Sequence, residues 1–150
     1  MLIGVVTKMN YTEFRKLKEE EANEFTEGKL FFAFGFSEEE VRRQLKEDYN
    51  VEAEDVVGIG AGAYILKDSY SDVMNFFSKQ AEEFKQFRLA NIYDSLIYEF
   101  GNHELEINLD YSYRSFLLEE LDFTEEEIEA NKSEINKAIQ DYRTDFYKHN

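Results

Sequence analysis

Cysteine and proline are absent from this 150-residue sequence, and glycine occurs only seven times. Without cysteine the chain can form no disulfide, no thiolate zinc site and no cysteine nucleophile. Because no proline-, glycine- or serine-rich stretch separates its segments, we expect one domain over residues 1–150 with no linker. Residues 1–8 are apolar but too short for a signal sequence or a membrane span, so we expect a disordered leader or an added strand there.

Basic side chains are also scarce. The chain has 17 lysines and arginines against 33 acidic residues, and its net charge is −16. Between Asp94 and Glu134, 13 acidic residues accompany two basic ones, Arg114 and Lys132, so this segment carries −11. Like charges that sum over a surface repel nucleic acid and attract basic proteins before contact. The segment therefore predicts a basic protein as the partner and no direct binding to nucleic acid.

The hydrophobic content is nevertheless high, at 43% of the residues, and aromatic residues make up 16%. Such a composition is typical of a folded chain and not of intrinsic disorder. A chain of this length buries roughly 68–70% of the surface that its unfolded form exposes. We therefore expect a globular cytoplasmic protein with a substantial core and no membrane partner.

Two nearly identical segments, Phe36–Val41 and Phe123–Ile128, predict the starts of two helices. Each has a hydroxyl residue, Ser37 or Thr124, at the N-cap and a glutamate three residues later, which is the pattern of a capping box. The phenylalanine before each cap is placed to pack on the apolar residue at the fourth helical position. The acidic triplets also complement the positive end of the helix dipole.

Apolar periodicity predicts the remaining elements. Helices are expected over five segments, namely 10–28, 37–50, 71–101, 113–121 and from 124 onward, and a kink or loop is expected near Arg88–Asn91. Strands are expected over 30–34, which reads as buried, over 57–66, and over 103–109, which alternates and reads as half-exposed. These elements predict the α+β class, with a small sheet of three or four strands packed with about five helices.

The glycine-rich stretch Gly58–Ala63 contains Gly-x-Gly-x-x-Ala, a variant of the dinucleotide-binding fingerprint. That fingerprint requires the glycines to follow a strand and to open a helix that receives the pyrophosphate. Here Tyr64–Leu66 continues as a strand. We therefore favour a strand with Gly58, Gly60 and Gly62 on one face, where a helix or an aromatic ring can approach closely. Dinucleotide binding is the alternative.

His103 is the one histidine outside the C-terminal end. In the predicted strand, alternation places it on the face opposite Glu104 and Glu106, which disfavours a metal site or a general base built from these residues. We interpret it as a buried or half-buried structural histidine, hydrogen-bonded near the turn at Gly101–Asn102. The sequence therefore assigns no catalytic residue, no cofactor and no metal ligand.

Three segments, Phe31–Phe34, Ile59–Ile65 and Tyr98–Glu104, resemble in order and spacing a family of small uncharacterised proteins from phages and mobile elements of Gram-positive bacteria. The resemblance extends from about Tyr11 to Ile139. Its anchors are glycine and aromatic positions, so it implies a shared fold and a mobile-element origin but no activity. It also implies a location in the cytoplasm of a bacterial host cell.

This resemblance and the acidic segment together predict a counter-defence inhibitor of the anti-CRISPR or antirestriction type, which occupies the basic nucleic-acid-binding cleft of a nuclease. Duplex DNA carries one charge per about 1.7 Å, so −11 corresponds to about 19 Å of duplex. The alternatives are an accessory protein-binding module without nucleic-acid mimicry, a small-molecule binder and a small hydrolase. The predicted partner-binding residues are Glu104, Glu106, Glu119, Glu120, Asp122, Glu125, Glu126 and Glu129.

Overall fold

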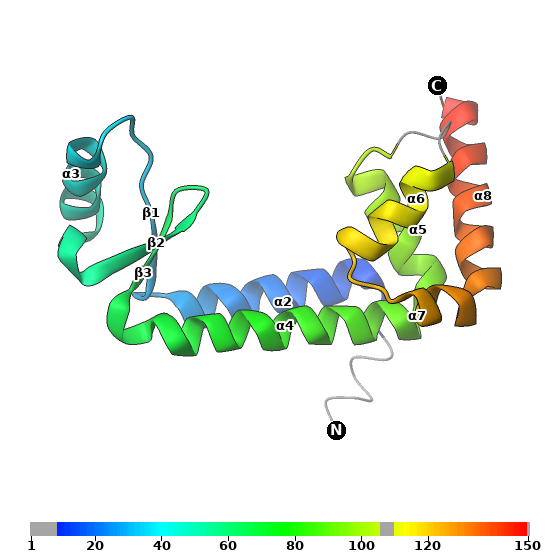
Figure 1. The fold of residues 1–150 in the computed structure, drawn as a ribbon, viewed down its shortest axis with the longest axis horizontal. Coiled ribbons are helices and arrows are strands. Elements are labelled where there is room, and N and C mark those ends of the chain that lie inside the picture. Colours follow the sequence, from blue (N-terminus) through cyan, green and yellow to red (C-terminus); the bar gives the residue numbers. More distant parts are fainter. Residues whose placement is uncertain (1–8, 106–109, 150) are drawn as a thin grey trace. The chain divides into compact units, whose positions relative to one another are not determined.

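A computed structural model describes residues 9–105 and 110–149 (Figure 1). Over these residues it has seven α-helices, two short 3-10 helices and a three-stranded sheet, which confirms the α+β class. The elements are, in chain order, α2 (Tyr11–Thr26), β1 (Leu30–Phe32), α3 (Glu38–Tyr49), η1 (Ala53–Asp55), β2 (Val56–Gly60), β3 (Ala63–Leu66), η2 (Lys67–Ser69), α4 (Tyr70–Ala90), α5 (Ile92–Asn102), α6 (Asp110–Glu119), α7 (Glu125–Ala130) and α8 (Lys132–His149). None of the described helices is both long and apolar enough to cross a membrane.

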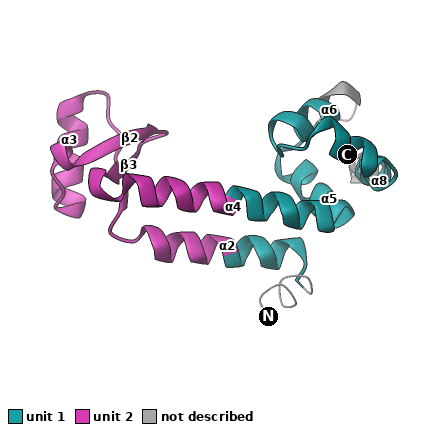
Figure 2. Ribbon diagram, turned by 60° about the horizontal axis from the view of Figure 1, so that its bottom comes forward, with its two compact units in different colours: residues 1–17, 81–150 teal, residues 18–80 magenta. Residues whose placement is uncertain are grey.

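The chain divides into two compact units (Figure 2). Unit 1 comprises residues 1–17 and 81–150, and unit 2 comprises residues 18–80. The boundary falls inside α2 and α4, so each of these helices contributes residues to both units. A single domain over residues 1–150 therefore stays a prediction.

The sheet of unit 2 is antiparallel, with strand order β1-β3-β2. Tyr64 of β3 pairs with Phe31 of β1 on one side and with Gly58 of β2 on the other, so these residues share one face. That face packs on α3, because Phe31 and Leu45 belong to the same buried cluster and Tyr64 packs against it. Burial of these side chains is the main contribution to holding the sheet on the helix.

The expected single strand over 57–66 is wrong, because a hairpin turn divides it into β2 and β3. Gly60, Ala61 and Gly62 all have positive φ, at 99°, 54° and 77°, a conformation that favours glycine. The expected close approach to aromatic rings is confirmed at two glycines. A Cβ on Gly58 would lie 3.3 Å from the ring of Tyr64, and one on Gly62 would overlap the ring of Phe34. No helix follows these glycines, so the dinucleotide fingerprint lacks its structural context.

The segment 30–34 was expected to be buried, but its burial alternates. Phe31 and Ala33 are buried, whereas Phe32 and Phe34 are 48% and 64% exposed. The reason is the pleat of the strand, which sends successive side chains to opposite faces. The face with Phe31 and Ala33 meets α3, and the other face leaves phenylalanines in contact with solvent.

The core of unit 1 is built by four helices. Its buried residues come from α5, α6, α7, α8 and the connection between α6 and α7, and they are Ile92, Leu96, Phe100, Tyr113, Phe116, Leu117, Leu121, Phe123, Ile128, Ile135 and Ala138. The ring of Phe100 lies 5.1 Å from Tyr113 and 6.0 Å from Phe116, both edge to face, the arrangement that aromatic pairs prefer. A smaller cluster joins Tyr11 and Phe14 of α2 to the end of α4.

Two expectations in unit 1 are wrong. The predicted strand 103–109 is not a strand over its described part, because His103 and Glu104 form a turn that closes α5 and Glu104 has a φ of 50°. Residues 106–109 lie outside the described residues. The last helix is interrupted at Asn131, whose side-chain amide donates to the carbonyl of Glu127 at 2.8 Å. The predicted break near Arg88–Asn91 is confirmed between α4 and α5.

Both predicted helix starts are confirmed. The hydroxyl of Thr124 accepts from the Glu127 amide at 3.1 Å, and the Glu127 carboxylate accepts from the Thr124 amide at 2.8 Å, which is a complete capping box. The hydroxyl of Ser37 accepts from the Glu40 amide at 3.2 Å, but the Glu40 carboxylate accepts from Phe36 instead. Phe36 is fully exposed, so its predicted packing on the helix is wrong.

Candidate functional site

Seven of the eight predicted partner-binding residues lie in the described part of unit 1, and all seven are exposed. They follow one another from the turn after α5, through the end of α6 and its connection to α7, to the body of α7. The eighth, Glu106, lies outside the described residues. We call the seven the acidic surface: Glu104, Glu119, Glu120, Asp122, Glu125, Glu126 and Glu129.

The connection between α6 and α7 explains how several of these carboxylates reach solvent. Leu121 and Phe123 are each 2% exposed and belong to the core, whereas Glu120 and Asp122 alternate with them and are exposed. The backbone is fixed by hydrogen bonds from Leu121 to Phe116 at 3.2 Å and from Phe123 to Leu117 at 2.9 Å. The apolar residues thus anchor the segment, and the acidic ones project away from the core.

Few cations neutralise the acidic surface. Arg114 forms an ion pair with Glu125. Lys85 pairs with Glu127 at 3.1 Å. The hydrogen bond from the Thr124 amide is the main cause that lowers the pKa of the Glu127 carboxyl, and Lys85 lowers it further. Among the described residues, the other six members of the acidic surface have no ion-pair partner within 4.0 Å. Their carboxylates remain available to a cationic partner.

A second cluster, centred on Glu99 of α5, was missed by the sequence reasoning. Glu99 is 2% exposed, and its Oε1 accepts from the Tyr11 hydroxyl at 2.7 Å and from the Arg15 guanidinium at 3.0 Å. Its Oε2 lies 3.2 Å from Nε2 of His103, and Arg88 donates to the Tyr11 oxygen at 2.9 Å. We call these five residues the Glu99 network.

The Glu99 network is best understood as a structural device. A buried carboxylate is costly unless it is paired and hydrogen-bonded, and here both oxygens have partners. Burial is the main cause that raises the pKa of Tyr11 to about 12; nearby Arg88 opposes it and Glu99 adds to it. The phenol therefore stays a hydrogen-bond donor to Glu99. The network joins the start of α2 to the end of α4 and to α5.

The surroundings of His103 differ from the expectation. Its side chain is 40% exposed, so the predicted burial is wrong, and its partner is Glu99, one helical turn earlier. The ring also packs on Phe116, with centroids 4.8 Å apart. In the described part of the chain, Glu99 is the one side chain that forms a hydrogen bond or ion pair with His103. The described residues contain no group of three or more His, Cys, Asp or Glu that could hold a metal ion. A carboxylate that orients a histidine is compatible with catalysis, but no nucleophile accompanies it there.

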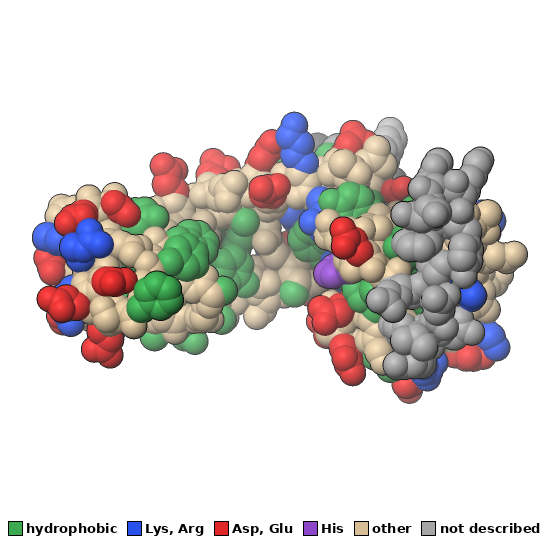
Figure 3. All heavy atoms as spheres, turned by 90° about the horizontal axis from the view of Figure 1, so that it is seen from above, with side chains coloured by type: hydrophobic (Ala, Val, Ile, Leu, Met, Phe, Trp, Pro, Cys, Tyr) green, Lys and Arg blue, Asp and Glu red, His purple; other side chains and the backbone are tan. Residues whose placement is uncertain are grey.

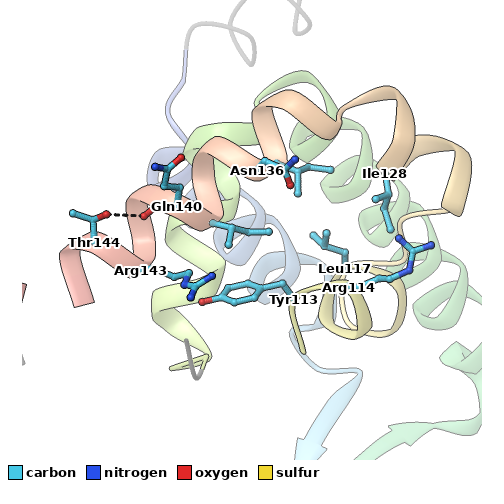
Figure 4. Close-up of a pocket in the computed structure, with 10 residues that line it drawn as sticks. Tyr113, Arg114, Leu117, Ile128, Asn136, Gln140, Arg143 and Thr144 are labelled. Atoms are coloured by element: carbon cyan, nitrogen blue, oxygen red, sulfur yellow. Dashed lines mark hydrogen bonds between the residues drawn. The ribbon is translucent and has the colours of Figure 1, made fainter. Parts of the chain in front are cut away.

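A groove of about 660 Å³ lies between α6, α7 and α8 (Figure 4). Leu117 and Ile128 form part of its apolar floor, while Arg114 and Arg143 lie on opposite sides of the view. Its remaining lining residues are Tyr113, Ile135, Asn136, Ile139, Gln140 and Thr144. None of the ten is acidic, so the groove is distinct from the acidic surface.

Unit 2 presents a different kind of surface. Seven of the eight large hydrophobic side chains exposed among the described residues belong to it: Phe32, Phe34, Phe36, Tyr49, Val57, Ile59 and Tyr70. Figure 3 shows hydrophobic side chains gathered on the face of unit 2 that it presents. In the same view, acidic and basic side chains lie on the rest of the visible surface of unit 2.

The fold and the site define a small α+β protein with an acidic helical surface on one unit and an aromatic surface on the other. The chain belongs to DUF7659, a family of unknown function, whose profile matches residues 13–145 and thus covers most of both units. No curated protein and no solved structure matches the chain.

Proposed function

We propose that this protein binds a basic protein through the acidic surface. In the specific form of the proposal, it is a counter-defence inhibitor from a phage or mobile element, and it occupies the nucleic-acid-binding cleft of a CRISPR or restriction nuclease. The observation that supports binding is the exposure of carboxylates that follow one another along the chain from the end of α5 to α7, six of them without an ion-pair partner among the described residues. The specific form adds the resemblance to proteins of mobile elements.

Electrostatics favours a cationic partner. Clustered charges of one sign steer an oppositely charged protein and raise its association rate, an effect that weakens as salt is added. The segment that contains the acidic surface carries −11, which is the charge of about 19 Å of duplex DNA. Because Glu99 is buried and Glu125 and Glu127 have ion-pair partners, a cleft that binds phosphates would meet part of this charge on the surface of the protein.

An accessory protein-binding role without mimicry is the alternative. It rests on the same exposed carboxylates but requires no overlap with the nucleic-acid site of the partner. The two forms differ in one observable: DNA or guide RNA displaces the protein from its partner under mimicry and leaves it bound otherwise. A small hydrolase has weaker support, because the Glu99 network lacks a nucleophile among the described residues.

The test compares two variants of equal net charge. The surface variant neutralises six members of the acidic surface to Gln or Asn: Glu104, Glu119, Glu120, Asp122, Glu126 and Glu129. Glu125 is retained because it pairs with Arg114, and Glu127 because it caps α7. The control variant neutralises six exposed carboxylates of unit 2: Glu19, Glu20, Glu24, Glu27, Asp48 and Asp68. Each variant has six fewer negative charges than the natural chain.

Binding and inhibition are measured on a panel of purified CRISPR effectors and restriction nucleases, at low and at physiological salt. We expect the natural chain and the control variant to bind one member alike and the surface variant to bind it far more weakly. Binding should weaken toward physiological salt, where the Debye length is about 8 Å. If no nuclease of the panel is bound, the specific form fails; if the two variants bind equally, the acidic surface is not the contact.

A further inference from the structure

The loop between β1 and α3 presents two aromatic side chains to solvent. Phe34 is 64% exposed and Phe36 is fully exposed. Phe36 also lies between two neighbouring hollows of about 480 and 500 Å³, because it lines both of them together with Gly35, Val41 and Tyr64. Scattered exposed apolar residues are ordinary, whereas a contiguous apolar surface with hollows is typical of a binding site.

The backbone of this loop is fixed although its side chains are exposed. The side-chain oxygen of Gln44 accepts from the Phe34 amide at 2.9 Å, and the side-chain nitrogen of Gln44 donates to the Phe34 carbonyl. The Glu40 carboxylate accepts from the Phe36 amide at 3.1 Å. The ring of Phe34 packs where a side chain on Gly62 would lie. A loop that is already ordered loses less conformational entropy when it binds a partner.

Charge decides which kind of occupant fits. Glu38 lines one hollow together with Arg42, whose guanidinium pairs with Glu54, and Glu40 lines the other hollow. Glu39 lies next to Glu38 on the first turn of α3. Within the described chain, neither Glu38 nor Glu39 has an ion-pair partner within 4.0 Å. A two-fold contact of this surface with itself would place the same carboxylates opposite one another, and an anionic membrane would repel them. A partner with Lys or Arg beside its apolar side chains would be attracted.

We propose that the surface formed by Phe34, Phe36, Val41 and Tyr64 binds a peptide segment of another protein, in which apolar side chains flank Lys or Arg. The apolar side chains occupy the hollows on either side of Phe36, and the cationic side chain faces Glu38 and Glu39. This inference does not rest on the proposed function, because it uses only residues of unit 2 and none of the acidic surface.

The probe is a random library of 12-residue peptides, selected on the immobilised full chain and counter-selected on the Phe36→Ser variant. We expect enriched peptides with at least two apolar residues next to Lys or Arg. A synthetic peptide of the enriched sequence should bind Phe36→Ser roughly tenfold more weakly or worse, as for an aromatic hot spot. Tyr70→Ser, which removes another exposed aromatic of unit 2, is the matched control and should bind normally.

Phe36→Ser should remain folded, as checked by circular dichroism, because the side chain it removes is fully exposed. The double variant Glu38→Gln/Glu39→Gln tests the charge separately and should bind the peptide more weakly at low salt. The proposal is overturned if selection enriches no peptide that depends on Phe36 or if the enriched peptides lack basic residues. A dimer, or binding to phosphatidylcholine vesicles, that Phe36→Ser abolishes would also overturn it in favour of another occupant.

Discussion

The two units carry the same net charge but present different surfaces. Unit 1 has 18 acidic and ten basic side chains, and unit 2 has 15 and seven, so each carries −8. Of the 21 buried apolar residues that the structure describes, 14 lie in unit 1, whereas seven of the eight exposed large hydrophobics lie in unit 2. Total charge therefore does not distinguish the units, and the arrangement of charged and apolar side chains does.

Ion pairs neutralise some carboxylates in both units. On α3 of unit 2, Arg42, Arg43 and Lys46 form ion pairs with nearby glutamates, so several carboxylates there are neutralised locally. In unit 1 six carboxylates of the acidic surface have no such partner among the described residues. Unpaired carboxylates are therefore present in both units, and the exposed large hydrophobic side chains, which lie mostly in unit 2, distinguish the two surfaces.

The largest expected effect separates the two cores. Leu96 and Leu45 are both fully buried, but Leu96 lies in a cluster of 11 buried residues and Leu45 in one of four. Replacing a buried leucine with alanine typically costs about 2–5 kcal/mol, and more where the surroundings cannot collapse. We expect the loss of unfolding free energy, measured by urea unfolding, to lie at the upper end of this range for Leu96→Ala and at the lower end for Leu45→Ala.

The same urea unfolding curves test the prediction that residues 1–150 form a single domain. Because α2 and α4 each contribute to both units, we expect each variant to unfold in one transition. Two separate transitions, one shifted by Leu96→Ala and the other by Leu45→Ala, would show instead that the units fold independently.

The next effect concerns the Glu99 network of unit 1. Removing one partner of a buried ion pair costs about 3–5 kcal/mol, and because the Arg15 side chain is 34% exposed we expect Glu99→Ala near the lower value. Glu99→Gln keeps an acceptor for the Tyr11 hydroxyl and should cost less. If Glu99→Ala is as stable as the natural chain, the Glu99 network does not contribute to the stability of the fold.

Local patterns predicted much of the fold. The starts of α3 and α7 follow from a few consecutive residues at Ser37 and Thr124, and the break between α4 and α5 follows from a phase jump in the apolar stripe. These features depend on short-range hydrogen bonds and periodicity, which the sequence displays directly. Seven of the eight predicted partner-binding residues are exposed, but their role in binding a partner stays a prediction.

Other features depend on contacts that no local pattern displays. The alternation after Gly101 favoured a strand, but His103 is held by Glu99 and the chain turns there. At the break at Asn131, the side-chain amide and the backbone amide of this residue both donate to the carbonyl of Glu127, a contact that the apolar periodicity does not display. Glu99 carried one usable signal, because it lies beside Leu96 and Phe100 on the apolar stripe of α5, where a carboxylate needs buried partners.

Helix caps give a smaller effect and a direct comparison between the units. Replacing an N-cap Ser or Thr with Ala costs about 0.5–2 kcal/mol. We expect Thr124→Ala in unit 1 to cost more than Ser37→Ala in unit 2, because Thr124 belongs to a complete capping box and Ser37 does not. Urea midpoints measure both, and the reverse order would contradict the assignment.

The last effect appears only at alkaline pH. The pKa of Tyr11 is raised from 10.0 to about 12, so folding favours the neutral phenol. Its contribution is fully present below pH 10 and is lost as the pH rises toward about 12. Tyr11→Phe removes this dependence, so the difference in urea midpoint between it and the natural chain should shrink from pH 9 to pH 11.5. A constant difference would contradict the raised pKa.

Competition with nucleic acid tests the central claim most directly. The protein is bound to the nuclease that it inhibits, at physiological salt, and increasing duplex DNA or guide RNA is added while the bound fraction is measured. If the acidic surface occupies the nucleic-acid cleft, the nucleic acid displaces the natural chain and the unit 2 control variant alike, and the surface variant is displaced at far lower concentrations. A natural chain that stays bound at saturating DNA and guide RNA would contradict nucleic-acid mimicry.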